Sequence, residues 1–175
     1  AHVVMWPILR LALSDGATVA EVAETTAPEP GAVARRTLAP ISPIAWDRAY
    51  LSEWRSANKV LSPDPANDQA MMLYALFEAL DEPLVEDDWR SLIGMRATAP
   101  TVRAPPAELW FGLKRAAVGG RKGETILRSL VMLGEGGLAN TDPIVLGIVV
   151  RSLAQVGLVA EARALAVDAV LAAGL

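Results

Sequence analysis

The last third of the chain contains two helical patterns joined by a very short turn, and this turn constrains the fold more than any other feature. Asp142 is a good N-cap, and Pro143 suits the first helical position because proline lacks only an N–H that would be unpaired there. Gly157 ends this first helix, and Gly174 ends the second. Helices joined by so short a connection pack as antiparallel neighbours, so the sequence predicts a helical hairpin over residues 143–174.

Apolar residues recur at every third or fourth position through both predicted helices, which places them on one face of each helix. They are Val145, Ile148, Val149, Leu153 and Val156 in the first helix and Val159, Ala162, Leu165, Ala166, Ala169 and Val170 in the second. Helical patterns also occur over residues 44–61, 70–80, 86–93, 107–118 and 120–133. The sequence therefore predicts an all-α fold.

A second copy of the hairpin pattern lies upstream. Four residues match four residues of the hairpin at a constant offset of 37 positions, namely Gly120 with Gly157, Glu124 with Glu161, Thr125 with Ala162 and Ser129 with Ala166. Known helical repeats have similar periods. The two copies are interpreted either as a genuine repeat or as two unrelated hairpins stacked in an ordinary helical domain.

The turn and second helix of the hairpin resemble those of a tetratricopeptide repeat (TPR). The residues that carry the resemblance are Gly157, Glu161, Ala162, Ala166 and Ala169. Small residues at such positions let the two helices of a TPR approach closely. The first helix departs from the family, since Val150 and Leu153 stand where a small residue and an aromatic one are usual. The resemblance implies stacked antiparallel helical hairpins, an α-solenoid-like arrangement with an irregular N-terminal helical part.

Residues 98–106 contain three prolines, which favours an extended connector. This connector separates an N-terminal helical part, residues 1–97, from the TPR-like hairpins, residues 107–175. We expect the two parts to form one compact unit. Because the chain starts without methionine and ends after a clean helix, we also expect it to be a mature form or a C-terminal domain of a longer protein.

Composition excludes several classes of function. The chain has no cysteine, which excludes thiol chemistry and cysteine-bound metals. Its net charge of -4 argues against a nucleic-acid binder, which would show a basic stripe. No apolar run is long enough for a transmembrane helix, and the compartment stays open between cytoplasm and periplasm.

Catalytic motifs are also missing. Residues 119–125, Gly-Gly-Arg-Lys-Gly-Glu-Thr, lack the Gly-Lys-Ser/Thr order of a phosphate-binding loop, and His2 is the only histidine. We therefore predict no catalytic residue, no metal ligand and no cofactor. The alternative is an all-α enzyme that uses carboxylates alone, for which the candidates are Glu53, Glu78, Asp87 and Asp88.

A protein-interaction or scaffold domain needs only stacked helices and one groove, which accepts a peptide or a partner helix. The sequence places four candidate binding residues on the inner faces of the hairpins and two more tryptophans within reach. These candidates are Trp110, Lys114, Arg151 and Gln155, with Trp54 and Trp89. The aromatic residues of 44–61 have a second interpretation, as core packing between helices.

Two further kinds of association stay open. The large apolar fraction of the sequence, 53%, would also suit a homo-oligomer. Residues 3–13 are apolar apart from Arg10, so they are either a membrane-surface helix or a buried first helix with Pro7 in its first turn.

Overall fold

The computed structural model describes residues 2–13, 46–61, 66–93 and 105–175, and all regular structure in these ranges is helical. The elements are α1 (His2–Ala12), α3 (Arg48–Leu61), α4 (Ala66–Ala79), α5 (Glu86–Arg90), α6 (Ala107–Val118), α7 (Lys122–Leu133), the 3-10 helix η1 (Leu138–Asn140), α8 (Pro143–Gln155) and α9 (Val159–Ala172). The prediction of an all-α fold is confirmed.

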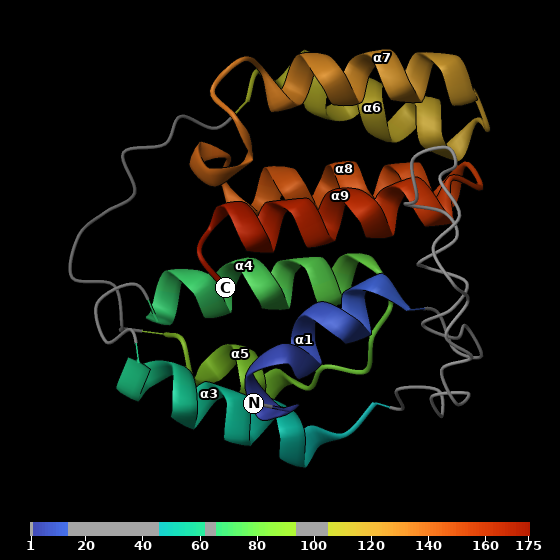
Figure 1. Cartoon of the computed structure of the whole chain (residues 1–175). Helices are drawn as coiled ribbons and strands as arrows, with labels where there is room; N and C mark the ends of the chain where they lie inside the picture. The colour runs from blue at the N-terminus through green and yellow to red at the C-terminus, as the bar shows by residue number, and fades with distance from the viewer. Residues whose placement is uncertain (1, 14–45, 62–65, 94–104) are drawn as a thin grey trace, which may run out of the picture.

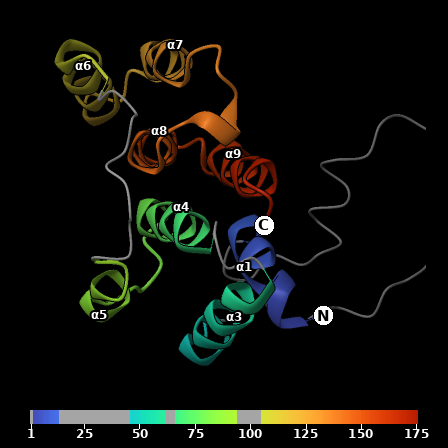
Figure 2. The same cartoon turned by 90° about the vertical axis from the view of Figure 1, so that its left-hand side faces the viewer.

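Pairs of helices lie on one another in an order that differs from the order of the chain. Figures 1 and 2 show α6 and α7 at one edge, then α8 and α9, then α4 and α1, and finally α5 and α3. We call this arrangement the stack. An α-solenoid stacks its repeats in chain order. Here the C-terminal hairpin lies in the middle, because α4 packs against α8 and α1 packs against α9. Residues of the two predicted parts, 1–97 and 107–175, therefore share one core. Residues 98–104 of the predicted connector lie outside the described residues.

The C-terminal hairpin begins and turns where the sequence predicts. The carboxylate of Asp142 accepts a hydrogen bond of 2.8 Å from the N–H of Ile144, and Pro143 is the first residue of α8. Gly157 has φ +82° in the turn before α9, and Gly120 has φ +65° in the turn before α7. Glycine adopts this left-handed conformation without the steric cost of a Cβ. The two glycines that match at the 37-residue offset thus perform the same role.

The small residues that match at this offset are buried in both hairpins. Thr125 and Ser129 of α7 and Ala162 and Ala166 of α9 each expose at most 3% of their surface. Small side chains at these positions let each helix approach its neighbours closely. The hairpins α6–α7 and α8–α9 are therefore equivalent in both their turns and their packing positions.

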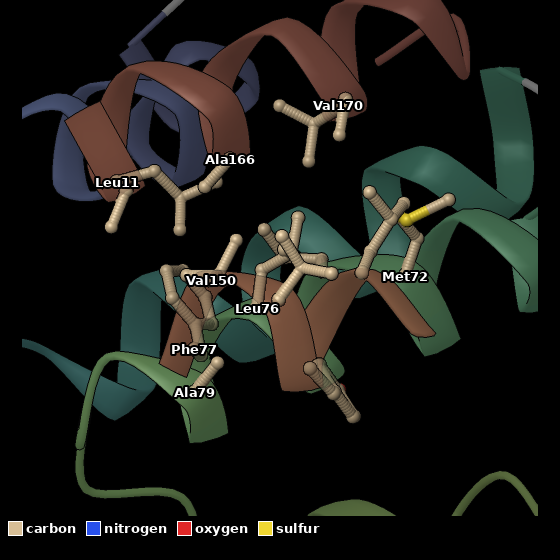
Figure 3. Close-up of a cluster of buried hydrophobic side chains, with 14 of the residues drawn as sticks. Leu11, Met72, Leu76, Phe77, Ala79, Val150, Ala166 and Val170 are labelled. Carbon is tan, nitrogen blue, oxygen red and sulfur yellow. The ribbon is translucent and has the colours of Figure 1, made fainter. Parts of the chain in front are cut away.

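The core of the stack lies where α4 meets α8 and α9. Figure 3 shows Leu76 and Phe77 of α4 next to Val150 of α8, and all three side chains are fully buried. Gly147 brings the two helix backbones together, because a Cβ added there would lie only 3.1 Å from the carbonyl oxygen of Ala75. The backbones of α4 and α8 are thus in direct contact at this point.

The first helix is buried, as one of the two interpretations of residues 3–13 predicts. Among residues 5–13, only Met5 is exposed, while Trp6 and Leu11 belong to the core. This burial leaves little apolar surface for a membrane on that segment. The expected place of Pro7 is wrong: α1 begins at His2, so Pro7 lies in the middle of the helix. In the described ranges, every helix is too short or too polar to cross a membrane.

Two helices are shorter than predicted. The helix expected over residues 44–61 begins only at Arg48. The helix expected over residues 86–93 ends at Arg90, and residues 91–93 form turns. The carboxylate of Asp88 accepts a hydrogen bond from the N–H of Val85 and thereby marks the start of α5.

Candidate functional site

A groove lies between α6, α8 and the C-terminal end of α4. It has a volume of about 740 Å³. Trp110 and Lys114 line it from α6, and Arg151 and Gln155 line it from α8. The structure thus brings together four of the six residues that the sequence analysis named. The groove is open to solvent, because Lys114 and Arg151 are both exposed.

Helical spacing explains why these four residues meet. Residues four positions apart lie on the same face of a helix. Trp110 and Lys114 therefore share one face of α6, and Arg151 and Gln155 share one face of α8. Because α6 packs beside α8, the two faces border the same hollow.

The other two tryptophans lie elsewhere, which corrects their assignment to the site. Trp54 exposes only 2% of its surface and packs in the core with Leu51, its neighbour on the buried face of α3. Trp89 of α5 packs edge-on against the ring of Tyr74, with the ring centroids 5.8 Å apart. Trp54 and Trp89 therefore serve packing between helices, because burying large rings stabilises the fold more than exposing them.

Arg151 fixes one wall of the groove. Its guanidinium donates hydrogen bonds to the backbone carbonyl of Glu78 and to the carboxylate of Asp81, the latter at 3.1 Å. Both acceptors belong to the C-terminal end of α4, where Asp81 has the left-handed φ of +58°. Arg151 therefore connects α8 to α4 at the surface. Lys114, by contrast, forms no ion pair within the ranges that the structure describes.

A buried cluster of charges lies at one end of the groove. The carboxylate of Glu82 accepts hydrogen bonds of 2.8 and 2.5 Å from Arg10, and it lies 3.6 Å from the guanidinium of Arg163. Arg163 also donates to the backbone carbonyls of Arg10, Leu11 and Leu13 at the end of α1. The last carbonyls of a helix lack partners within the helix, so Arg163 caps α1. The cluster fixes this end of the groove.

Two smaller hollows adjoin the groove. One, of about 270 Å³, shares Asp81 and Arg163 with the groove and extends to Trp46. The other, of about 420 Å³, shares Lys114 and Val118 and extends to Phe111. Each of the two hollows therefore borders the groove through residues that line both.

Sequence reasoning missed Leu80, Asp81 and Arg163, which also line the groove. Arg163 had a signal of its own, since it is the only charged residue on the side of α9 that carries the buried alanines. Leu80 and Asp81 had none, because their role depends on α4 packing against α8.

The carboxylates of the alternative enzymatic interpretation do not form a site. Glu53 and Glu78 are exposed on α3 and α4. Asp87 pairs with Arg90 at 2.7 Å, and Asp88 lies 3.3 Å from Arg48. Within the described part of the chain, no cluster of three or more acidic or histidine side chains has the arrangement that a metal ion needs.

The groove remains the strongest candidate site on physical grounds alone. No protein-family model matches the chain, and no similar protein is found among curated proteins or solved structures.

Proposed function

We propose that this chain is a protein-interaction domain that binds a peptide or a partner helix in the groove between α6, α8 and the end of α4. The observation that carries this proposal is the combination of an apolar floor, a basic rim and two adjoining hollows that share lining residues with the groove. A small-molecule pocket encloses most of its ligand. A surface that is open along its length is better suited to an extended partner.

The floor of the groove supplies apolar contact area. Trp110, Leu80 and Ile148 are half-buried there, so each is held by the core and still presents part of its surface. Tryptophan is among the residues that most often dominate binding energy at interfaces, especially when its position is fixed by neighbours. Trp110 is therefore the expected anchor for an apolar side chain of the partner.

The rim of the groove carries mostly positive charge. Lys114, Arg151 and Arg163 line it, and Asp81 is its acidic member. Arg151 pairs with Asp81 and Arg163 with Glu82, so Lys114 supplies the positive charge that has no ion pair in the described part of the chain. The chain as a whole has a net charge of -4, so this basic rim stands out on an acidic protein. Complementary charge steers a partner to its site and rejects partners of the wrong sign. We therefore expect an amphipathic partner with apolar anchors and acidic residues beside them.

Selection from a display library of random dodecamer peptides tests the proposal without requiring the natural partner. Selection on the purified chain is expected to enrich peptides that combine apolar and acidic residues. Binding of the enriched peptides, measured by fluorescence anisotropy, is expected to weaken about tenfold or more in Trp110→Ala, the size typical of a central aromatic anchor. The separate variant Lys114→Glu is also expected to weaken peptide binding, and to remove most of the dependence of that binding on salt concentration.

Exposed residues of α3 provide matched controls. Val60→Ala and Lys59→Glu change an apolar and a basic side chain far from the groove, and both are expected to leave peptide affinity unchanged. The proposal is wrong if selection enriches no peptide, or if the enriched peptides bind Trp110→Ala and Lys114→Glu as tightly as the parent chain.

A further inference from the structure

Helix α7 presents four of its larger apolar residues to solvent, whereas Thr125, Ser129 and Met132 face the core. Thr125 and Ser129 are buried. Leu127, Leu130 and Val131 expose 66%, 61% and 59% of their surface. With Ile126, these three residues form what we call the α7 stripe. A helix at the surface of a domain normally has the opposite polarity, since burial of apolar area stabilises the fold.

The other edge of the stack shows the usual polarity. Most exposed residues of α3 are polar, among them Ser52, Glu53, Ser56 and Lys59, and its exposed large apolar residues are Tyr50 and Val60 near its two ends. In stacked helical proteins, the terminal units need polar outer faces to remain monomeric and soluble. Figure 1 shows α3 at one edge of the stack and α7 at the other. One edge is therefore mainly polar, while the other exposes a contiguous apolar stripe of the kind that marks an interaction site.

The exposed residues of α7 and its C-terminal turn match in pairs about the midpoint between Arg128 and Ser129. The pairs are Leu127 with Leu130, Ile126 with Val131, Gly123 with Gly134, and Lys122 with Glu135. All eight of these residues are exposed. Equal sizes stand at equal distances from the midpoint, and at the outermost pair the charges are opposite.

This pairing is the pattern that an antiparallel contact between two identical helices requires. In a twofold-symmetric dimer, each residue on one side of the axis contacts its counterpart in the other copy. We propose that α7 binds α7 of a second copy of this chain, with the twofold axis between Arg128 and Ser129. Leu127 of each copy then packs against Leu130 of the other, and Ile126 packs against Val131.

Charge complementarity selects this register and direction. Lys122 of each copy faces Glu135 of the other at both ends of the contact. Neither residue has an ion-pair partner in the described part of its own chain, whereas Glu124 is held by Arg121 at 2.6 Å and by Arg128 at 2.7 Å. A parallel pairing would place Lys122 against Lys122, and like charges in contact are unfavourable.

The dimer contact and the groove are independent surfaces. The groove is lined from α4, α6, α8 and α9, and no residue of the α7 stripe belongs to it. A dimer through α7 therefore presents two open grooves. A single helix pair is a small interface, so we expect a weak dimer that forms at micromolar concentrations or above.

Sedimentation velocity over a concentration series tests the association. The parent chain is expected to change from monomer to dimer between about 1 µM and about 1 mM, the range of weak protein complexes. Leu127→Glu and Leu130→Glu are each expected to weaken the dimer by about tenfold or more, because each buries a charge in the contact. Val60→Glu, an equally exposed apolar site on α3, is the matched control and is expected to dimerise normally. A parent chain that stays monomeric throughout, or one whose dimer survives both substitutions, overturns the proposal.

A charge swap tests the register. Lys122→Glu alone and Glu135→Lys alone each place like charges together and are expected to weaken the dimer several-fold. The double variant restores opposite charges, so it is expected to recover the parent affinity. Additive weakening in the double variant contradicts the proposed register.

Cross-linking tests the direction of the helices. The chain contains no cysteine, so introduced thiols have no background. A mixture of Ile126→Cys and Val131→Cys chains is expected to form disulfide-linked dimers faster than either variant alone. Faster self-cross-linking of the single variants would show a parallel contact and overturn the proposal.

Discussion

Arg163 of α9 donates a hydrogen bond of 3.0 Å to the backbone carbonyl of Leu13, which lies 150 residues earlier in the chain. The same guanidinium nitrogen also serves the carbonyls of Arg10 and Leu11, and Glu82 lies beside it. One side chain near the C-terminus thereby holds the end of the first helix. Polar contacts as well as core packing therefore join α1 to α9.

Arg163→Met is expected to destabilise the protein strongly. It leaves the carbonyls at the end of α1 without a donor and removes one partner of the buried Glu82. Breaking a buried ion pair typically costs about 3–5 kcal/mol. Arg151→Met is the matched control, since its ion pair with Asp81 is exposed and is worth about 1 kcal/mol or less. Urea unfolding followed by circular dichroism measures both. Equal losses in the two variants would contradict the capping role of Arg163.

Gly147→Ala is expected to lower the free energy of unfolding. The added Cβ would lie 3.1 Å from the carbonyl oxygen of Ala75, and a backbone oxygen cannot rotate away. Overpacking of this kind costs about 1–3 kcal/mol, which exceeds the gain of about 0.5–1 kcal/mol from replacing a helical glycine. Gly123→Ala in α7 is the matched control, because its Cβ would meet no atom within 4 Å. Thermal unfolding is expected to show opposite signs for the two variants.

Tyr74 makes stability sensitive to alkaline pH. Burial raises the pKa of the Tyr74 phenol, and the nearby guanidinium of Arg55 opposes that rise. Since the folded pKa is above the unfolded one, the stabilising contribution is complete below about pH 10, the usual value for tyrosine. It is lost as the pH rises through the folded pKa. The free energy of unfolding is therefore expected to fall more steeply above pH 10 in the parent chain than in Tyr74→Phe. Tyr50 is the other tyrosine of the chain, and Tyr50→Phe is the control. Its free energy of unfolding is expected to fall above pH 10 as steeply as that of the parent chain.

Asp142→Ala is expected to destabilise the C-terminal hairpin by about 1 kcal/mol, the usual value of an N-cap side chain. The carboxylate accepts from the N–H of Ile144, which otherwise has no partner at the start of α8. Asp142→Asn keeps an acceptor oxygen and is expected to lose little. A full loss in the asparagine variant, measured by urea unfolding, would show that the charge matters and the cap does not.

Local features of the fold were readable from the sequence. Pro143 and Gly157 mark where α8 begins and where its turn lies, and α6 has the predicted bounds, residues 107–118. These features depend on backbone chemistry within a few residues. For the same reason, the residues that line the groove on α6 and on α8 could be named as pairs spaced four apart.

Contacts between distant helices could not be predicted in the same way. Periodicity shows that α4 has a buried face, but it does not show that Ala75 meets Gly147 across the core. The burial of Trp54 could not be predicted for the same reason. The roles of Asp81 and Arg163 in the groove also depend on how distant helices pack together. Amphipathic patterns identify the face that packs, whereas the partner of that face is decided by the whole chain.

The central place of the C-terminal hairpin has a consequence for biosynthesis. Helices α1 and α4 are translated before α8 and α9, the helices against which they pack. Until then, α1 has only α3 and α4 to pack against, and the apolar surface that faces α8 and α9 stays uncovered, which is the condition under which nascent chains aggregate or bind chaperones. Completion of the stack therefore waits for α9, and a chain that stops before α9 lacks the Arg163 guanidinium that donates to the carbonyls at the end of α1.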